Sequence, residues 1–312
     1  MNTPRYINPL TDFGFKKIFG NEDVMIAFLN DLLEPKSPIA HVLFLDKDEL
    51  GLTKYERGVI YDLRCTCDDG SEVIVEMQNK GQLNFSDRII YYLSRSISSQ
   101  AEKGNTEWDY KLTPVYGVFF INFHLQGFKP QSIRTIQMKV NETGEIFNEN
   151  LKAFTLELPG YRKMQESDCK TYMDYWLYNL ANMETMTTPM PFQAQRPIFS
   201  KVGNISELVN MTEQEREIYN ISLDSYRTNL SVMRNERAEG RAEGRAEGRA
   251  EGLVEGRAEG RAEGLVEGRA EGRVEGREEK AFEMARAMLQ DGESIDKIMR
   301  YTKLSREQIE NL

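Results

Sequence analysis

Residues 59–80 read VIYDLRCTCDDGSEVIVEMQNK, and this stretch decides the fold class of the chain. Its two runs of alternating apolar and polar residues, 59–67 and 71–80, are typical of β-strands that bury one face. Between them, Asp68 to Gly70 fits a three-residue turn whose last position is left-handed, a conformation that glycine adopts without strain. The stretch therefore predicts a β-hairpin.

The turn length sets the register of this hairpin, because a three-residue loop places Cys67 opposite Ser71. One face is then apolar throughout: Tyr61 faces Met77, Leu63 faces Val75 and Cys65 faces Val73. On the other face Asp62 lies opposite Glu76, and Gln78 follows on the same side. Directly opposed Cβ atoms lie about 4.5–5.5 Å apart. A two-residue turn would mix polar and apolar side chains on both faces, which is disfavoured when one face is buried.

Two carboxylates held this close repel each other unless a cation lies between them. Carboxylate oxygens suit Mg²⁺ or another divalent cation, which usually keeps several waters and completes its shell with substrate phosphate. The alternative is a solvated polar face of the sheet. Because the acids and Gln78 are followed by a helix that bears arginines, the sequence favours a metal site for phosphate chemistry.

Asp62, followed on the next strand by Glu76-Met77-Gln78, resembles the PD-(D/E)XK nuclease signature in its E-x-Q form. Residues 11–20, TDFGFKKIFG, are similar to the opening of one branch of that superfamily, the recombination-promoting nucleases, which are also named transposases. The resemblance extends to about Glu236 and to the style of the C-terminal tail. Two positions depart from the signature: Tyr61 replaces its proline, and Gln78 replaces its lysine, which removes a cation.

This resemblance implies an α/β fold with a restriction-endonuclease-like mixed-sheet core flanked by helices, plus a helical C-terminal extension. It also implies a Mg²⁺-dependent DNA endonuclease that hydrolyses phosphodiester bonds. Asp62, Glu76, Gln78 and Lys80 would be catalytic, and Asp62, Glu76 and the carbonyl of Met77 would bind the metal. Gln78 would orient a water or a phosphate oxygen. Lys80 has the same parity along the strand and would partly replace the missing lysine.

A helix is predicted after the hairpin, from an N-cap at Ser86 to about Lys103. The residues expected to face the sheet are Ile90, Leu93 and Ile97. Arg88, Tyr91 and Arg95 recur at i, i+3 and i+7, so they form one stripe that could contact DNA phosphates. A solvated helix face is an equally good interpretation of this stripe.

Asp12 and Gln100 are candidates for supporting the site from outside the hairpin. Asp12 follows Thr11, a candidate N-cap, so its other interpretation is a stabilising charge at a helix N-terminus. Gln100 lies off the arginine stripe, and only the family pattern, which has a glutamine in this region, points to it.

The rest of the chain predicts further strands and helices around this hairpin. Residues 41–45 are expected to form an edge strand, and residues 115–123 a central strand that is buried on both sides. The intervening helix would complete a right-handed βαβ unit. Additional strands are expected at 133–140 and 151–158, with helices beginning near 12, 22 and 170 and spanning 205–234.

Composition excludes several classes of function. Two histidines make a histidine-based nucleophile or a multi-histidine metal site implausible, and the three cysteines are expected to be buried thiols in a reducing cytosol. The formal net charge of −10 argues against a nucleic-acid binder held by bulk charge, although a metal and local arginines could supply positive potential at a site. The chain has no bilayer-length apolar run and no signal-peptide pattern near its start, so a cytoplasmic protein without membrane contact is expected.

Four segments are expected: a nuclease-like core at 1–165, a helical extension at 166–236, a repeat at 237–276 and a helical tail at 277–312. The repeat has the form Arg/Leu-Ala/Val-Glu-Gly, with a glycine at every fourth residue that costs about 1 kcal/mol relative to alanine in a helix. Its charges place like residues, not opposite ones, at i and i+4. We expect a marginal, frayed helix or a flexible spacer.

The tail is predicted to form short helices that resemble a helix-turn-helix. It contains seven basic and eight acidic residues, which is a poor composition for a phosphate-seeking surface. Self-association into a homo-oligomer, or docking of a partner, is therefore favoured over DNA reading. The alternative function is that of a catalytically weak or inactive family member, which acts through this tail as a binding or regulatory protein.

Overall fold

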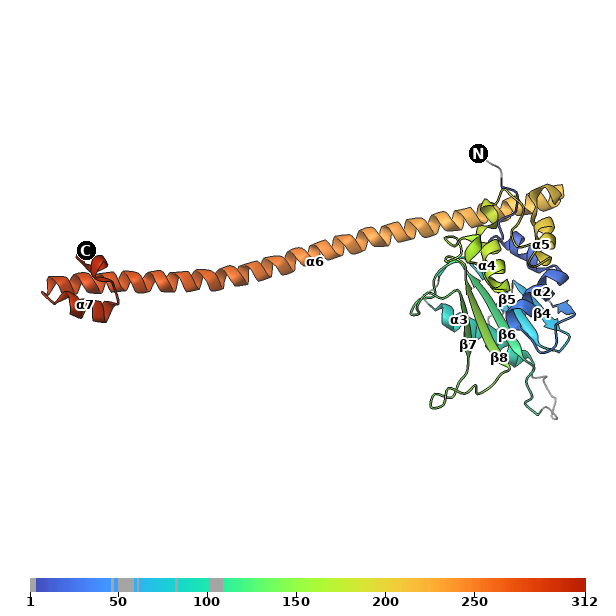
Figure 1. Ribbon diagram of the computed structural model, residues 1–312, viewed down its shortest axis with the longest axis horizontal. Coiled ribbons are helices and arrows are strands. Elements are labelled where there is room, and N and C mark those ends of the chain that lie inside the picture. The colour runs from blue at the N-terminus through green and yellow to red at the C-terminus, as the bar shows by residue number, and fades with distance from the viewer. Residues whose placement is uncertain (1–3, 46–47, 50–58, 61, 82–83, 101–108) are drawn as a thin grey trace. The chain divides into compact units, whose positions relative to one another are not determined.

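The computed structural model describes residues 4–45, 48–49, 59–60, 62–81, 84–100 and 109–312 (Figure 1). The chain divides into two compact units, residues 1–233 and 234–312. One long helix, α6 (Glu213–Gln290), contributes residues to both units. The predicted boundaries near 165 and 276 stay predictions.

The first unit is built on a six-stranded mixed sheet with the strand order β1-β4-β5-β6-β8-β7. The strands are β1 (Val42–Phe44), β4 (Leu63–Cys67), β5 (Glu72–Gln78), β6 (Val115–Ile121), β7 (Ile133–Gln137) and β8 (Leu151–Glu157). The strands β5, β6 and β8 are parallel, and the other neighbouring pairs are antiparallel. The predicted mixed sheet, its edge strand β1 and the parallel crossover from β5 to β6 are confirmed.

Helices cover both faces of this sheet (Figure 1). One face packs against α1 (Asp12–Phe19), α2 (Glu22–Leu33), α4 (Tyr172–Asn182) and α5 (Ile198–Ser206), and the other against α3 (Phe85–Ser99). Three short 3₁₀ helices connect these elements: Glu166–Asp168, Met183–Thr185 and Leu208–Asn210. The larger core contains an aromatic cluster of Phe15, Phe19, Phe28, Phe120 and Trp176. All three cysteines are buried, as predicted.

The hairpin has the register that the turn length predicts. Leu63 pairs with Val75 and Cys65 with Val73, and Gly70 has a φ of 82°. The prediction of one continuous strand over 59–67 is wrong, because β3 (Val59–Ile60) pairs instead with β2 (Asp48–Glu49) in a separate small sheet. Asp62 therefore lies at a bend just before β4. The predicted contact of Tyr61 with Met77 lies outside the described residues.

The helix α3 differs from its prediction in its start and in its buried face. It begins at Phe85 after Asn84, so Ser86 is not the N-cap, and the predicted end at Lys103 lies outside the described residues. Ile90 is 62% exposed, and its neighbour Ile89 is buried against the sheet instead. The buried residues of α3 are Phe85, Ile89, Tyr92, Leu93 and Ser96.

The helix predicted over 205–234 is also wrong in its extent. Residue 205 belongs to the end of α5, and a 3₁₀ turn separates α5 from α6, which begins at Glu213. Within the described ranges, no helix combines the length and the apolar run that are needed to cross a bilayer.

The second unit consists of the rest of α6 with α7 (Ile295–Thr302) and α8 (Arg306–Glu310). Ala285, Ile298, Leu304 and Ile309 form its small apolar core, which confirms the predicted short tail helices. The repeat at 237–276 is helical, but its side chains are almost entirely exposed, and nothing approaches within 4 Å of the position that a Cβ would take on its glycines. No packing supports the repeat within this unit, so its marginal stability in solution stays a prediction.

Candidate active site

The acids Asp62 and Glu76 lie side by side where the pairing of β4 with β5 ends. The backbone N–H of Asp62 donates a hydrogen bond to Glu76 Oε1 at 3.0 Å. The backbone N–H of Met77 donates to Asp62 Oδ2 at 2.8 Å. Each carboxylate is thus held by the main chain of the opposite strand, so the backbone of the hairpin fixes the two acids as a pair.

Burial makes this pair electrostatically unusual. The Glu76 side chain is only 2% exposed, and burial, followed by the charge of Asp62, raises the pKa of Glu76 to about 8. Burial also raises the pKa of Asp62, while the hydrogen bond from Met77 opposes the shift. A buried carboxyl group beside a half-buried one resists ionisation, and both gain from a nearby cation.

Two side chains approach the second oxygen of Glu76, and neither contact is close. Gln78 Nε2 donates to Glu76 Oε2 at 3.4 Å, and Arg88 Nη2 lies 3.7 Å from the same oxygen. Arg88 is held in place by Tyr92, because it donates to the Tyr92 hydroxyl at 2.6 Å and its guanidinium lies 4.9 Å from the ring centroid. Arg88 therefore offsets part of the charge of Glu76.

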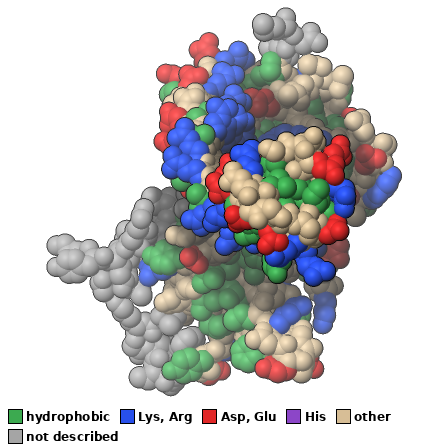
Figure 2. Space-filling model, turned by 90° about the vertical axis from the view of Figure 1, so that its left-hand side faces the viewer, with side chains coloured by type: hydrophobic (Ala, Val, Ile, Leu, Met, Phe, Trp, Pro, Cys, Tyr) green, Lys and Arg blue, Asp and Glu red, His purple; other side chains and the backbone are tan. Residues whose placement is uncertain are grey.

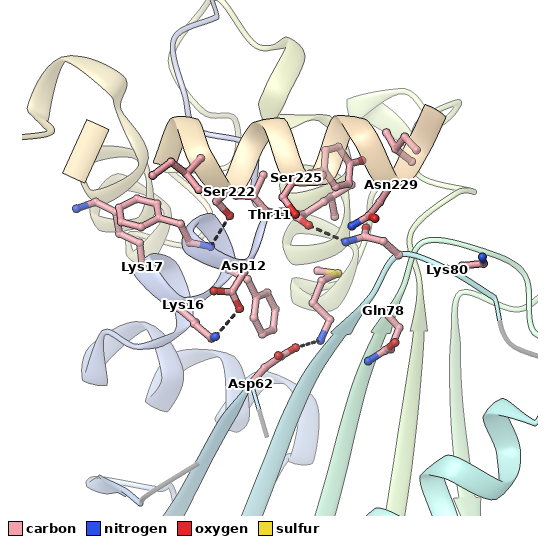
Figure 3. A pocket seen from close by; sticks show the side chains of 18 of the residues that line it. Thr11, Asp12, Lys16, Lys17, Asp62, Gln78, Lys80, Ser222, Ser225 and Asn229 are labelled. Atoms are coloured by element: carbon pink, nitrogen blue, oxygen red, sulfur yellow. Dashed lines mark hydrogen bonds and ion pairs between the residues drawn. The ribbon is translucent and has the colours of Figure 1, made fainter. Parts of the chain in front are cut away.

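A cavity of ≈ 1130 Å³ opens beside Asp62, between α1, the end of β5 and the first turns of α6 (Figure 3). The charged and amide side chains that line it on the side of α1 and β5 are Asp12, Lys16, Lys17, Asp62, Gln78, Asn79 and Lys80. Glu76 does not line the cavity, but Asp62 and Gln78, which are hydrogen-bonded to it, do. Figure 3 shows Lys80 at the far end of the cavity, directed away from Asp62.

The helix α1 brings a lysine close to the acids. Lys16 forms an ion pair with Asp12 (Figure 3), and the charges of both affect Asp62: Lys16 lowers the pKa of Asp62 and Asp12 raises it. Lys17, the next residue, pairs with Glu215 of α6. The cavity therefore places lysine side chains beside its carboxylates, although the chain as a whole is acidic.

A profile described as PD-(D/E)XK nuclease family transposase matches residues 9–236. The chain belongs to the PD-(D/E)XK nuclease family. A second profile, the C-terminal HTH domain of the Rpn/YhgA-like nuclease family, matches residues 278–312. Comparison with curated proteins and with solved structures found no match. The family predicted from the hairpin signature is confirmed, as is the helix-turn-helix character of the tail, and membership supports a nuclease-type function.

The donor set of this member of the PD-(D/E)XK nuclease family fits a hard divalent cation. In the described part of the chain, no group of three or more His, Cys, Asp or Glu side chains is arranged to hold a metal. The acid pair offers two carboxylates, however, and Mg²⁺ commonly binds one or two carboxylates and takes its other ligands from water and phosphate. Burial raises the pKa of both Asp62 and Glu76, and the charge of Asp62 adds to the rise at Glu76, so a bound cation would favour their ionised forms.

Tyr91 and Arg95 were predicted to contact DNA phosphates together with Arg88, and the structure places them differently from Arg88. Tyr91 is 43% exposed, since α3 turns Tyr92 toward Arg88 instead. Arg95 lies two turns beyond Arg88, where α3 passes Glu72: the hydroxyl of the adjacent Ser96 donates to Glu72 Oε1 at 2.6 Å. The predicted stripe therefore does not converge on the acid pair.

Gln100 is also far from the acids in the fold. Its amide oxygen accepts from the backbone N–H of Thr113 at 2.9 Å, just before β6. Val115, at the start of β6, pairs with Glu72 at the start of β5, whereas Glu76 lies near the end of β5. Gln100 therefore fixes the entry to β6 at the opposite end of the sheet.

The helix α6 provides a wall of the cavity that the sequence pattern does not predict. Ser222, Ser225 and Asn229 line the cavity from α6, and Ser222 Oγ accepts a hydrogen bond from the backbone N–H of Phe13 at 3.1 Å. Their spacing of i, i+3 and i+7 marks one helix face. Nothing in the local sequence indicates that this face covers the end of a strand more than a hundred residues earlier.

Proposed function

We propose that this protein is a divalent-metal-dependent DNA endonuclease that hydrolyses phosphodiester bonds at the Asp62–Glu76 pair. The observation that carries the proposal is the pair of hydrogen bonds through which the hairpin backbone fixes these two acids together. Two further observations support it: the acids adjoin a cavity with lysine side chains, and the chain belongs to a nuclease family.

Asp62, Glu76 and the carbonyl of Met77 would hold Mg²⁺ or another divalent cation. Such an ion lowers the pKa of a bound water and stabilises the charge on a phosphate oxygen. The hairpin backbone keeps Asp62 and Glu76 in position, so that little reorganisation is needed when the metal binds.

The remaining residues would position the substrate and balance charge. Gln78 stands beside Glu76 Oε2, where its amide would orient a water or a phosphate oxygen, without the charge of a lysine. Arg88 offsets part of the charge of Glu76, and Lys16 does the same for Asp62. Lys80, at the far end of the cavity, would contact the DNA backbone.

A second candidate function follows from Gln78, which stands where the family signature has lysine. The chain would then be a weak or inactive nuclease that works as a binding or regulatory protein through residues 278–312, which match a helix-turn-helix domain. The tail would also mediate a homo-oligomer. A chain truncated after Glu236 would then sediment as a smaller species, whereas an unchanged oligomeric state would remove the idea.

Plasmid cleavage tests the nuclease proposal. Wild type, Asp62→Asn and Glu76→Gln would be assayed over a series of Mg²⁺ and Mn²⁺ concentrations, with Glu142→Gln, an exposed carboxylate in a remote turn, as the matched control. We expect wild type and control to cut at equal rates and each acid variant to be slower by at least about 100-fold. Equal cleavage by all four proteins, or cleavage by none of them, would overturn the proposal.

A further inference from the structure

The first turns of α6 present one continuous face to the cavity. The residues of α6 that line it include Ile218, Ile221, Ser222, Ser225, Asn229 and Val232. Ile218, Ser222, Ser225, Asn229 and Val232 follow one another at spacings of three or four residues and form a row along the helix, and Ile221 lies beside Ser222. Glu215 also lines the cavity from α6 and is paired with Lys17, so the rest of this wall is uncharged.

This wall combines exposed aliphatic side chains with available polar groups. Ile218, Ile221 and Val232 are 54%, 66% and 47% exposed, so they offer apolar surface to whatever enters the cavity. Ser225 and Asn229 point from α6 into the cavity (Figure 3), and neither side chain makes a hydrogen bond within the described part of the chain. An asparagine amide is both a donor and an acceptor.

The position of the wall is fixed by several contacts between α6 and the segment around α1. The hydroxyl of Ser222 makes one of these contacts, because it accepts a hydrogen bond from the backbone N–H of Phe13. The Tyr219 hydroxyl accepts from the backbone N–H of Asn8 at 2.9 Å, and Lys17 pairs with Glu215. These contacts hold α6 in position against the segment around α1. Ser225 and Asn229 take no part in them.

Across the cavity lie the lysines Lys16, Lys17 and Lys80, beside the acids Asp12 and Asp62. A nucleotide matches both sides, because the lysines attract its anionic phosphate while its base has an apolar face and a hydrogen-bonding edge for the side of α6. In a duplex the base faces are stacked and only the groove edges are accessible, so aliphatic side chains meet a base face only where the base is unpaired. The volume of ≈ 1130 Å³ exceeds the roughly 300–1,000 Å³ of typical small-ligand pockets, which leaves room for a nucleotide.

We propose that this face of α6 binds an unpaired nucleobase next to the scissile phosphate. Ile221 lies against the face of the base, while Ser225 and Asn229 bind its edge. The substrate class is accordingly a single strand, or a duplex with an unpaired nucleotide at the cleavage position. The inference rests on the proposed nuclease function for the identity of the ligand, but its test does not require cleavage.

The test measures binding to the full-length protein in EDTA, where no metal-dependent cutting occurs. The probes are a fluorescein-labelled single strand of mixed sequence and a strand of the same length that carries abasic sites in the middle. The variant is Ile221→Ser with Asn229→Ala. The control is Asn220→Ala, which removes the same amide from the same helix at an exposed position that does not line the cavity.

We expect the double variant to bind the normal strand at least about fivefold more weakly than wild type, and to bind the abasic strand as wild type does. The control should match wild type on both probes. An unchanged affinity for the normal strand, or an equal loss on both strands, would overturn the inference. If base-dependent binding holds while neither plasmid nor single-stranded DNA is cleaved in Mg²⁺ or Mn²⁺, the nuclease proposal fails and the base-binding face remains.

Discussion

Glu76 Oε1 and the backbone nitrogen of Asp62 are joined by a hydrogen bond of 3.0 Å. The contact crosses from β5 to the bend before β4, and the return bond from Met77 to Asp62 closes the arrangement. Because these two hydrogen bonds hold the acids side by side, a change in the charge of either acid alters the ionisation of the other, and the pair titrates as one unit. The chemistry of the site therefore depends on the geometry of the hairpin.

The raised pKa of Glu76 predicts how stability depends on pH in the metal-free protein. The ordinary value is 4.5 and the folded value is about 8, so the folded chain binds this proton more tightly than the unfolded chain. The contribution of Glu76 to stability is thus fully present below about pH 4.5 and is lost as the pH rises toward 8.

Urea unfolding of wild type and Glu76→Gln in EDTA, from pH 5 to pH 8.5, measures this effect. The free energy of unfolding of wild type should fall relative to the variant by at least about 1 kcal/mol, the equivalent of less than one pKa unit. Parallel curves for the two proteins would show that Glu76 titrates as an ordinary glutamate.

Arg88 is predicted to set the pH range of cleavage. Its charge lowers the pKa of Glu76, so Arg88→Gln should raise that pKa and leave less of the carboxylate ionised at neutral pH. We expect the acidic limb of the rate–pH profile to move to higher pH and kcat/KM at pH 7 to fall by about 10-fold. Arg88→Lys, which keeps the charge, should retain the limb. If both substitutions lower the rate without moving the limb, Arg88 acts only in DNA binding.

Gln78 and Lys80 are predicted to have different effects on cleavage. Gln78 Nε2 lies 3.4 Å from Glu76 Oε2, whereas Lys80 is directed away from Asp62 (Figure 3). Steady-state kinetics should show kcat reduced at least about 10-fold by Gln78→Ala. Lys80→Ala should mainly raise KM. A larger drop in kcat for Lys80→Ala would mean that this lysine turns inward and replaces the missing signature lysine.

The repeat at 237–276 is expected to be a marginal helix. Its glycines have open space around them, so alanine fits at these positions, and each replacement should favour the helix by about 1 kcal/mol. Hydrogen exchange followed by mass spectrometry should show rapid exchange in the wild-type repeat and slower exchange in a Gly248→Ala, Gly252→Ala, Gly256→Ala variant. Strong protection in wild type, comparable with that of α3, would contradict the expectation.

The sequence was sufficient to predict the hairpin because two independent signals agree there. Gly70 requires a turn with a positive φ, and the apolar alternation of the strands tolerates only one register. The buried parallel strand β6 could be predicted equally well, since it is apolar along nearly its whole length. These features place Glu76 beside Asp62 without further information.

The orientation of α3 could not be predicted, for a specific reason. Residues 89–92 read Ile-Ile-Tyr-Tyr, so a rotation of the helix by one residue exchanges one isoleucine and one tyrosine for their neighbours at little cost in hydrophobicity. Packing against β5 and β6 selects Ile89 and Tyr92. The predicted burial of Ile90 was wrong for that reason, because helix periodicity alone does not distinguish between adjacent residues of the same type, while the DNA contacts of the stripe stay a prediction.

The α6 side of the cavity could not be predicted from the sequence either, because it depends on packing between segments far apart in the chain. Viewed as a sequence, Ser222, Ser225 and Asn229 are ordinary polar residues of an amphipathic helix. Only the tertiary contacts of Tyr219 and Ser222 with the chain near α1 show which face is turned toward the acid pair. The space-filling view shows acidic, basic and hydrophobic side chains on the face that it presents (Figure 2).

The account depends on the ability of the Asp62–Glu76 pair to bind a divalent cation, and Mn²⁺ titration followed by electron paramagnetic resonance measures this directly. Wild type and the remote control Glu142→Gln should bind Mn²⁺ with the same affinity. Asp62→Asn and Glu76→Gln should each weaken binding by at least about 10-fold. Equal Mn²⁺ affinity in all four proteins would contradict the account.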